Sequence, residues 1–156
     1  MSAVLQQPNV TVRPMRDVDI DAVLAIENEM YEFPWTEGIF RDCLRVGYCC
    51  WLLTEAEKVV AYAVLSVAAG ESHLLNVCVG KEYQRLGYAS KLIEHMLELA
   101  KSHDAGVCLL EVRPSNTAAV TLYEKMNFVE VGVRPAYYPA KKGREDALIL
   151  ALELIY

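Results

Sequence analysis

The sequence predicts an α/β domain in which helices flank a central mixed β-sheet. Its 156 residues are 54% hydrophobic and 23% charged, which provides enough apolar side chains for one sizeable core. In the middle of the chain, a helical pattern separates two apolar strand patterns, and this order favours parallel neighbouring strands. Elsewhere, strand patterns follow one another without a helix and indicate antiparallel pairs. We expect a single domain spanning residues 1–156.

The expected elements follow from hydrophobic periodicity and from turn residues. In order, they are strand 10–13, helices 17–30 and 36–45, strands 48–54, 59–67 and 74–79, helix 90–101, strand 107–112, helix 117–126, and strands 129–134 and 147–155. The first strand alternates polar and apolar residues. The first helix places Ile20, Val23, Leu24 and Glu27 at helical spacing behind a cap at Asp17 or Asp19. Residues 33–36 end that helix and cap the next one.

Turn and cap signals organise the rest of the chain. The polar turn 55–58 predicts a hairpin between the strands on either side. Residues 107–112 are apolar on both faces apart from Glu111, as in a strand at the centre of a sheet. Asn116 starts the next helix, and Asn127 suits a left-handed exit from it. Residues 135–146 are expected to be the loop between the last two strands.

Charge and composition restrict the class of protein. The net charge of −6 and the pI of about 5.1 argue against broad nucleic-acid binding and permit a cationic peptide or amine as substrate. No apolar run is long enough to span a bilayer, and residues 1–9 lack a signal-peptide core. The five cysteines are therefore expected to be reduced thiols in a cytoplasmic protein, with Cys78 and Cys108 as small buried hydrophobes. Their spacing does not suggest a metal site.

An anion-binding loop is predicted at residues 84–89, Gln-Arg-Leu-Gly-Tyr-Ala. Here backbone N–H groups point outwards at the positive end of a helix dipole, and Gly87 and Ala89 leave room for a phosphate. Three positive charges surround the loop: Lys81, Arg85 and Lys91. The spacing is neither the dinucleotide fingerprint nor a Walker loop, and one glycine before a helix is also typical of an ordinary turn. A diphosphate-bearing ligand is the first hypothesis.

The chain resembles the GNAT family of N-acetyltransferases along nearly its whole length. Residues 84–89 are similar to the pyrophosphate loop of that family, and Asn116 followed seven positions later by Tyr123 matches its second signature. Further motifs are similar to the branch of bacterial ribosomal-protein-alanine acetyltransferases: Phe33-Pro34-Trp35, Leu110-Glu111-Val112-Arg113-Pro114-Ser115-Asn116, Leu122-Tyr123-Glu124, Asn127-Phe128, Tyr137-Tyr138-Pro139 and Gly143-Arg144-Glu145-Asp146-Ala147.

The resemblance implies acetyl-CoA as co-substrate and no metal. The thioester would lie where the parallel strands 74–79 and 107–112 diverge. The cofactor-binding residues implied are the backbone N–H groups of Val77, Cys78 and Val79, the loop residues Gln84, Arg85, Leu86, Gly87, Tyr88, Ala89 and Ser90, and Asn116. Asn116 is equally suited to capping its helix, so both roles stay open.

Two residues are candidates for proton transfer. A lone carboxylate in a buried strand is costly, so Glu111 either pairs with an arginine such as Arg113 or acts as a general base. The resemblance favours the base, working directly or through water on an α-amine whose pKa is about 7.7–8.0. Tyr123 is either an aromatic on the apolar face of its helix or the general acid for the leaving thiolate. The resemblance again favours the catalytic role.

Loop aromatics suggest where an acceptor binds. Phe33, Trp35, Tyr137 and Tyr138 are expected in loops and indicate a peptide-binding cleft, although Trp35 also suits a hydrophobic staple. The resemblance implies acetylation of the N-terminal alanine of a small-subunit ribosomal protein, protein eighteen. Two alternatives remain: the same chemistry on another N-terminus, a lysine or a small amine, and a regulatory acyl-CoA-binding module without turnover.

Overall fold

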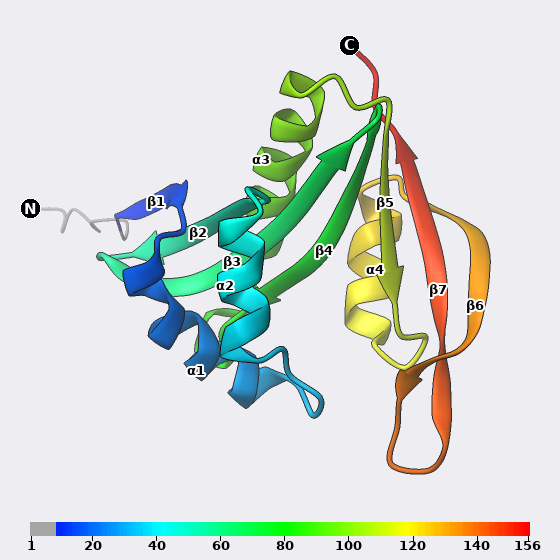
Figure 1. The fold of residues 1–156 in the computed structure, drawn as a ribbon, viewed down its shortest axis with the longest axis horizontal. Coiled ribbons are helices and arrows are strands. Elements are labelled where there is room, and N and C mark those ends of the chain that lie inside the picture. The colour runs from blue at the N-terminus through cyan, green and yellow to red at the C-terminus, as the bar shows by residue number, and fades with distance from the viewer. Residues whose placement is uncertain (1–8) are drawn as a thin grey trace, which may run out of the picture.

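The computed structural model describes residues 9–156, which form a seven-stranded mixed sheet flanked by helices (Figure 1). The strands are β1 (Val10–Pro14), β2 (Cys49–Glu55), β3 (Lys58–Ala68), β4 (Glu71–Val79), β5 (Val107–Val112), β6 (Val129–Pro139) and β7 (Arg144–Glu153). The helices are α1 (Ile20–Met30), α2 (Glu37–Arg45), α3 (Tyr88–Ser102) and α4 (Thr117–Lys125), with short 3-10 turns at Asp17–Asp19 and Lys81–Tyr83. The sheet order is β1-β2-β3-β4-β5-β7-β6, and the predicted fold class is confirmed.

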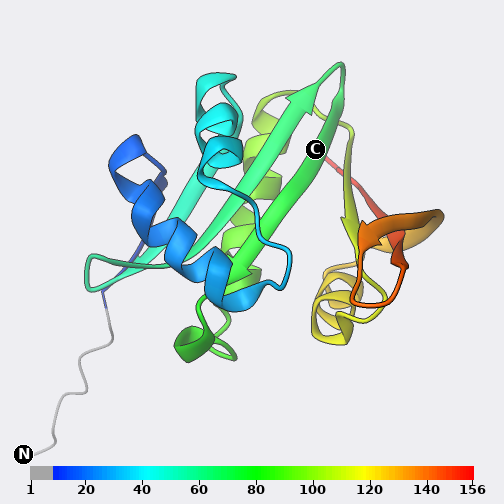
Figure 2. The same ribbon diagram turned by 60° about the horizontal axis from the view of Figure 1, so that its bottom comes forward.

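Two hydrophobic cores lie on opposite faces of the sheet. On one face, α1 and α2 pack on β2, β3 and β4 through residues such as Ile20, Phe40 and Leu52. On the other face, α3, α4 and the C-terminal strands share a larger core that includes Met96 and Leu110. Figure 2 shows α1 and α2 on one side of these strands and α3 on the other. Among the described residues, the buried members of the α1–α2 core include none from β5, β6 or β7, so this face of those strands has no helical cover.

The two central strands pair in parallel over a short length only. Residues 71–74 of β4 pair with residues 107–110 of β5, and beyond that point the strands diverge (Figure 1). A bulge in the pairing of β3 with β4, at Val64 and Leu65, coincides with the point of divergence. The splay expected between residues 74–79 and 107–112 is therefore present.

The last two strands are longer than the sequence pattern indicates. Residues 135–146 were expected to be a loop, but β6 continues to Pro139 and β7 begins at Arg144. Tyr137 and Tyr138 consequently lie on a strand, and their prediction as loop residues is wrong. The register shifts between Arg134 and Tyr138, and this irregularity, beside Pro135, hides the strand periodicity.

The caps agree with the sequence at two helices and differ at one. Thr36 accepts a hydrogen bond from the N–H of Ile39 at 3.3 Å, and Asn127 has the expected left-handed backbone with φ of 73°. The Asp19 side chain accepts no hydrogen bond from the N–H groups of α1. Its carboxylate accepts two 2.8 Å hydrogen bonds from the Arg13 guanidinium and one of 2.8 Å from the Arg16 N–H, at the start of the 3-10 turn before α1. No helix of residues 9–156 is long and apolar enough to cross a membrane. Residues 1–9 were expected to lack a signal-peptide core, and of these residues the structure describes only Asn9.

Candidate active site

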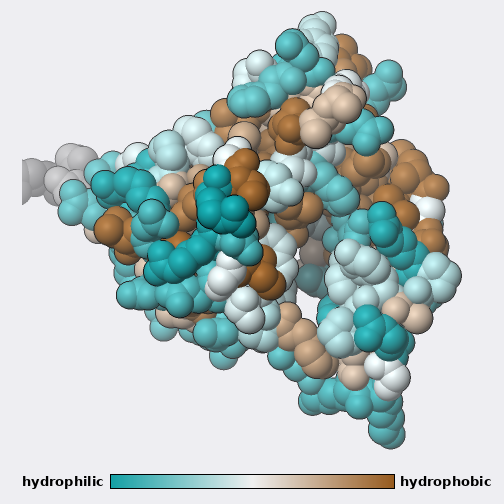
Figure 3. Space-filling model, in the orientation of Figure 1, coloured by the Kyte–Doolittle hydropathy of each residue, from teal (hydrophilic) through white to brown (hydrophobic). Residues whose placement is uncertain are grey.

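A cleft of about 570 Å³ opens where β4 and β5 diverge. Its walls come from β4, β5 and α4, from α1 and the segment between α1 and α2, and from the β6–β7 hairpin. Figure 3 shows this face hollowed between the part that carries α1 and α2 and the part that carries β6 and β7. Both predicted proton-transfer residues, Glu111 and Tyr123, line this one cleft.

Glu111 lies near the end of β5 with only 11% of its side chain exposed. Its Oε1 is 3.3 Å from Nε of Arg134 and 3.7 Å from Nε2 of His73. The carboxylate therefore has the Arg134 guanidinium, on β6, as its cationic partner and the His73 imidazole, on β4, beside it. The arginine that pairs with it is Arg134 rather than Arg113, whose guanidinium lies 3.2 Å from Glu145.

Tyr123 projects from α4 and packs edge-on against Phe128, with ring centres 5.7 Å apart. The residue is 9% exposed, so it belongs to the core and also borders the cleft. Burial, and to a lesser extent the nearby Tyr138, raises the pKa of Tyr123. Its hydroxyl therefore keeps its proton at neutral pH, as a general acid requires.

The predicted anion-binding loop leads into α3 with an open helix end. Arg85 and Gly87 both have left-handed backbones, with φ of 64° and 79°, a geometry that turns successive N–H groups outwards. Gly87 is the N-cap and supplies no capping side chain, and the first turn of α3 contains no acidic residue. The first-turn N–H groups of Tyr88, Ala89 and Ser90 are thus left for an anion.

Two side chains of this loop, Gln84 and Tyr88, are hydrogen-bonded to neighbouring strands and point away from the anion site, whereas two others are exposed. Gln84 reaches back to the carbonyl oxygen of Val79, 3.4 Å from its Nε2. The Tyr88 hydroxyl donates to Oε2 of Glu55 on β2 at 2.9 Å, so Tyr88 offers the loop only its backbone. Leu86 is 58% exposed and Arg85 is exposed.

Strand β4 presents backbone groups to the open side where β5 has diverged. The Tyr31 hydroxyl donates to the Val77 carbonyl at 2.9 Å, whereas the Gly80 N–H donates to Val60 of β3 at 2.8 Å. Because successive residues of a strand alternate in direction, Val77 and Val79 face the open side and Cys78 faces β3. The expectation of a free N–H at Cys78 is therefore wrong. The Cys78 side chain is 5% exposed, as expected for a small buried hydrophobe.

Two aromatic arms meet across the mouth of the cleft, one between α1 and α2 and the other on the β6–β7 hairpin. Arg113 connects them, because its guanidinium carbon lies 5.5 Å from the ring centre of Phe33 and 4.4 Å from that of Tyr138. Trp35 lines the cleft and also packs on Phe40, with ring centres 5.3 Å apart. It therefore serves both as a wall of the cleft and as a hydrophobic staple.

Asn116 caps α4, because its Oδ1 accepts a hydrogen bond from the Ala119 N–H at 3.2 Å.

The comparisons with known proteins agree with this architecture. Residues 20–128 match the model of the acetyltransferase (GNAT) family. The chain belongs to this family. It is an N-acetyltransferase, 37% identical over 144 residues to the ribosomal protein bS18-alanine N-acetyltransferase of Escherichia coli strain K12, an alignment that covers 92% of this chain and 97% of the relative. The Haemophilus ducreyi protein of the same description is 32% identical over 137 residues, 87% of this chain and 94% of its own.

Solved structures are similar over almost the whole acetyltransferase. The ribosomal-protein-S18-alanine N-acetyltransferase from Escherichia coli aligns with a TM-score of 0.88 at 36% identity, covering 94% of this chain and 95% of that one. Ard1 from Thermoplasma volcanium aligns with a TM-score of 0.86 at 25% identity, covering 94% and 99%. Within residues 9–156 of this acetyltransferase, no group of three or more His, Cys, Asp or Glu side chains is arranged to hold a metal ion.

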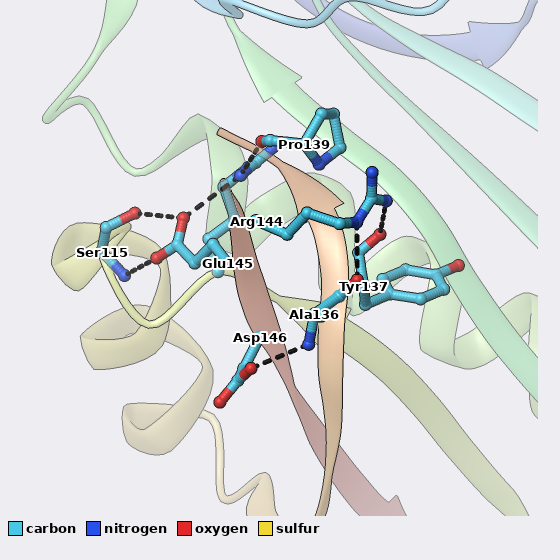
Figure 4. A network of polar contacts seen from close by, with 8 residues as sticks. Ser115, Ala136, Tyr137, Pro139, Arg144, Glu145 and Asp146 are labelled. Atoms are coloured by element: carbon cyan, nitrogen blue, oxygen red, sulfur yellow. Dashed lines mark hydrogen bonds and ion pairs between the residues drawn. The ribbon is translucent and has the colours of Figure 1, made fainter. Parts of the chain in front are cut away.

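The hairpin motif 143–147 of the acetyltransferase holds the second arm in place (Figure 4). Arg144 donates to the carbonyls of Ala136 and Tyr137 at 2.7 and 2.8 Å, and Asp146 accepts from the Ala136 N–H at 2.8 Å. Glu145 accepts from the N–H and the hydroxyl of Ser115, at 3.0 and 2.9 Å. These contacts fix the irregular part of β6, which carries Tyr137 and Tyr138, against β7 and the start of α4. Hydrogen bonds from Ser115, and then the hydrogen bond and charge of Arg113, lower the pKa of Glu145.

Several residues of the site carry no signal in the sequence strong enough to find them. Arg134 and His73 flank Glu111, and Tyr31 and Asn76 line the cleft, but nothing in their local patterns distinguishes them. Glu27 did leave a signal, because it occupies a helical position in line with the buried Ile20 and Val23. A carboxylate at such a position is buried and must be hydrogen-bonded.

Proposed function

We propose that this N-acetyltransferase transfers the acetyl group of acetyl-CoA to the N-terminal alanine α-amine of ribosomal protein bS18. The observation that carries the proposal is that Glu111 and Tyr123 line the same cleft at the point where β4 and β5 diverge. The acceptor is taken from the names of the relatives, which the chain matches over nearly its full length. With a ribosomal protein as acceptor, the reaction takes place in the cytoplasm.

The cofactor end of the site consists of backbone donors. The outward N–H groups of the 84–90 loop bind the pyrophosphate, with positive charge from Lys81, Arg85 and Lys91 around it. The N–H groups of Val77 and Val79 bind the pantetheine arm, and one of them polarises the thioester carbonyl. Backbone donors fixed in a sheet require little reorganisation as negative charge develops on that oxygen.

The chemical step is direct attack of the amine on the thioester carbonyl carbon. Glu111 accepts a proton from the α-ammonium through water, and the nitrogen lone pair then forms the new C–N bond. The C–S bond breaks, and Tyr123 donates its proton to the leaving thiolate. The nitrogen loses its second proton as it becomes the amide, and this proton returns to Tyr123 through water, so only the proton taken up by Glu111 is released to solvent. Because an α-amine has a pKa of about 7.7–8.0 against about 10.4 for lysine, a carboxylate base suits an N-terminus better than a lysine.

A thiol-release assay tests the acceptor. Three matched peptides start with the bS18 N-terminal sequence: one with a free α-amine, one with a blocked α-amine and a free lysine, and one with both blocked. Turnover of the free α-amine peptide above the other two is the expected result. Preference for the lysine peptide would move the enzyme to lysine acetylation, and acetyl-CoA binding without turnover on any amine would indicate a regulatory module.

A further inference from the structure

Glu27 is a buried carboxylate in the wall of the acceptor cleft with only neutral partners. It is 2% exposed and lines the cleft from the C-terminal half of α1. Its Oε1 accepts from the Tyr62 hydroxyl at 2.5 Å and from Nδ2 of Asn76 at 3.0 Å, and its Oε2 accepts from the Trp35 N–H at 2.8 Å. None of the ion pairs among residues 9–156 includes Glu27.

The other buried carboxylate of the cleft has the opposite environment. Glu111 lies 3.3 Å from the Arg134 guanidinium, so its charge is balanced within the protein. Buried carboxylates are ordinarily paired with a cation, because hydrogen bonds from neutral groups replace water only in part. Glu27 is therefore the carboxylate in this cleft whose counter-charge the described chain does not supply.

Asn76 connects this charge to the open part of the cleft. Its hydrogen bond to the Glu27 carboxylate fixes Nδ2 as the donor, which leaves Oδ1 as an acceptor. Asn76 also lines the cleft, one residue before Val77 on the open edge of β4. An ammonium group beside Asn76 would donate to Oδ1 and supply the missing positive charge.

We propose that Glu27 and Asn76 form the subsite that recognises the primary ammonium of the acceptor. Resting on the proposed function, this assigns to Glu27 the selection of a charged N-terminus before Glu111 removes its proton. Substrate binding then places a positive charge beside Asn76, next to a carboxylate that has no cationic partner in the free enzyme. The arrangement selects against uncharged N-termini, because they leave the buried carboxylate unbalanced.

The test compares two peptides that differ only in charge. One begins with alanine, and in the other a lactic acid residue replaces that alanine, so a hydroxyl stands in place of the ammonium. Their dissociation constants are measured by calorimetry with the CoA-bound enzyme at about pH 6.5, where the α-amine is protonated. We expect wild type to bind the ammonium peptide at least tenfold more tightly. Equal affinities would overturn the proposal.

Glu27→Gln removes the charge with little change of shape. The side chain can still be accommodated, because the Tyr62 hydroxyl can accept as well as donate and the Asn76 amide can turn over. In this variant the ratio of the two dissociation constants should fall to within about threefold of unity. An unchanged ratio, or an equal loss of affinity for both peptides, would make Glu27 a structural residue only.

Matched variants separate recognition from folding. Glu29→Gln removes the same charge from an exposed position of α1, and Tyr62→Phe removes one hydrogen bond but keeps the carboxylate. Both should keep the wild-type ratio. Should Glu27→Gln not fold, Asn76→Ala decides, since loss of Oδ1 must also reduce the preference. An enzyme that discriminates between the peptides but acetylates neither N-terminal nor lysine amines would contradict the proposed function and leave this subsite standing.

Discussion

At the scale of the single residue, Tyr123 keeps its proton because burial raises its pKa. Loss of the hydroxyl in Tyr123→Phe preserves the ring that packs on Phe128 and removes only the proton donor. We expect turnover to fall about 10²–10⁴-fold, the usual range for general acid catalysis, with acetyl-CoA affinity unchanged. Steady-state kinetics and calorimetry measure the two quantities. Tyr48→Phe, at an exposed position outside the cleft, is the control, and near wild-type turnover of Tyr123→Phe would return Tyr123 to the core.

The raised pKa of Tyr123 also predicts a pH dependence. A group whose pKa is raised remains protonated to higher pH than free tyrosine, whose pKa is about 10. Tyr123 should therefore impose no loss of turnover between pH 7 and 10. A decline in kcat in that interval that disappears in Tyr123→Phe would contradict this assignment.

Glu111→Gln tests the base. The variant keeps the shape of the side chain and loses its basicity, so below about pH 8 it must wait for the small fraction of unprotonated α-amine. Turnover of the variant should be lowest near pH 6.5 and should partly recover above pH 8, while wild type changes less. The pH profile of kcat for an alanine peptide measures this difference. A variant as fast as wild type near neutral pH would leave Glu111 as the structural partner of Arg134 and His73.

At the scale of the element, the junction of the 84–90 loop with α3 depends on Gly87. Gly87→Glu places a negative charge at an anion site, on a backbone with φ of 79° that favours glycine. We expect acetyl-CoA affinity to fall at least tenfold, about 1.4 kcal/mol. Gly47→Glu is the matched control, because Gly47 has φ of 84° and, like Gly87, has open space around an added Cβ. Equal acetyl-CoA affinity in the two variants would show that the pyrophosphate does not bind at this loop.

Arg113 joins the two arms over the cleft. Its guanidinium lies over the rings of Phe33 and Tyr138, and its Nη1 donates a hydrogen bond to the Pro139 carbonyl at 2.8 Å. Arg113→Met keeps much of the apolar stem and removes the charge and the donors. We expect KM for the peptide to rise about tenfold, with acetyl-CoA affinity retained. Arg45→Met, on the exposed end of α2, is the control, and an unchanged peptide KM would show that the arms hold without Arg113.

Local signals allowed much of the fold to be predicted, and long-range contacts account for the differences. The bounds of β5 and the cap at Asn116 follow from a few neighbouring residues, so the sequence alone was sufficient. The strand character of Tyr137 and Tyr138 depends on contacts between Arg144 and the carbonyls of β6, which no local pattern reports. The same holds for Glu111, since Arg134 meets it through strand pairing across β7.

At the scale of the whole molecule, the two candidate proton-transfer residues lie on opposite faces of the sheet. The core of α3 and α4 holds Tyr123, and the opposite face, left without helical cover beyond β4, carries Glu111. Both residues reach one cleft because β4 and β5 stop pairing after residues 74 and 110. An acyl donor and an acceptor can then approach the same point from different directions.

Burial of thiols in the core of α1 and α2 limits the stability of the molecule at alkaline pH. Cys50 is 5% exposed, and burial raises its pKa to about 12, whereas a thiol in the unfolded chain has a pKa of about 8.5. Its contribution to stability is therefore complete below about pH 8.5 and is lost as the pH rises towards 12. Over pH 9–10.5 one such thiol lowers the free energy of unfolding by about 1.4 kcal/mol per pH unit. We expect Cys50→Ala to make that pH dependence shallower by about this amount in urea unfolding under reducing conditions. Cys49→Ala is the matched control, because the neighbouring thiol is less buried and its pKa is raised less. An identical slope in wild type and Cys50→Ala would mean that Cys50 ionises in the folded protein as readily as in the unfolded chain.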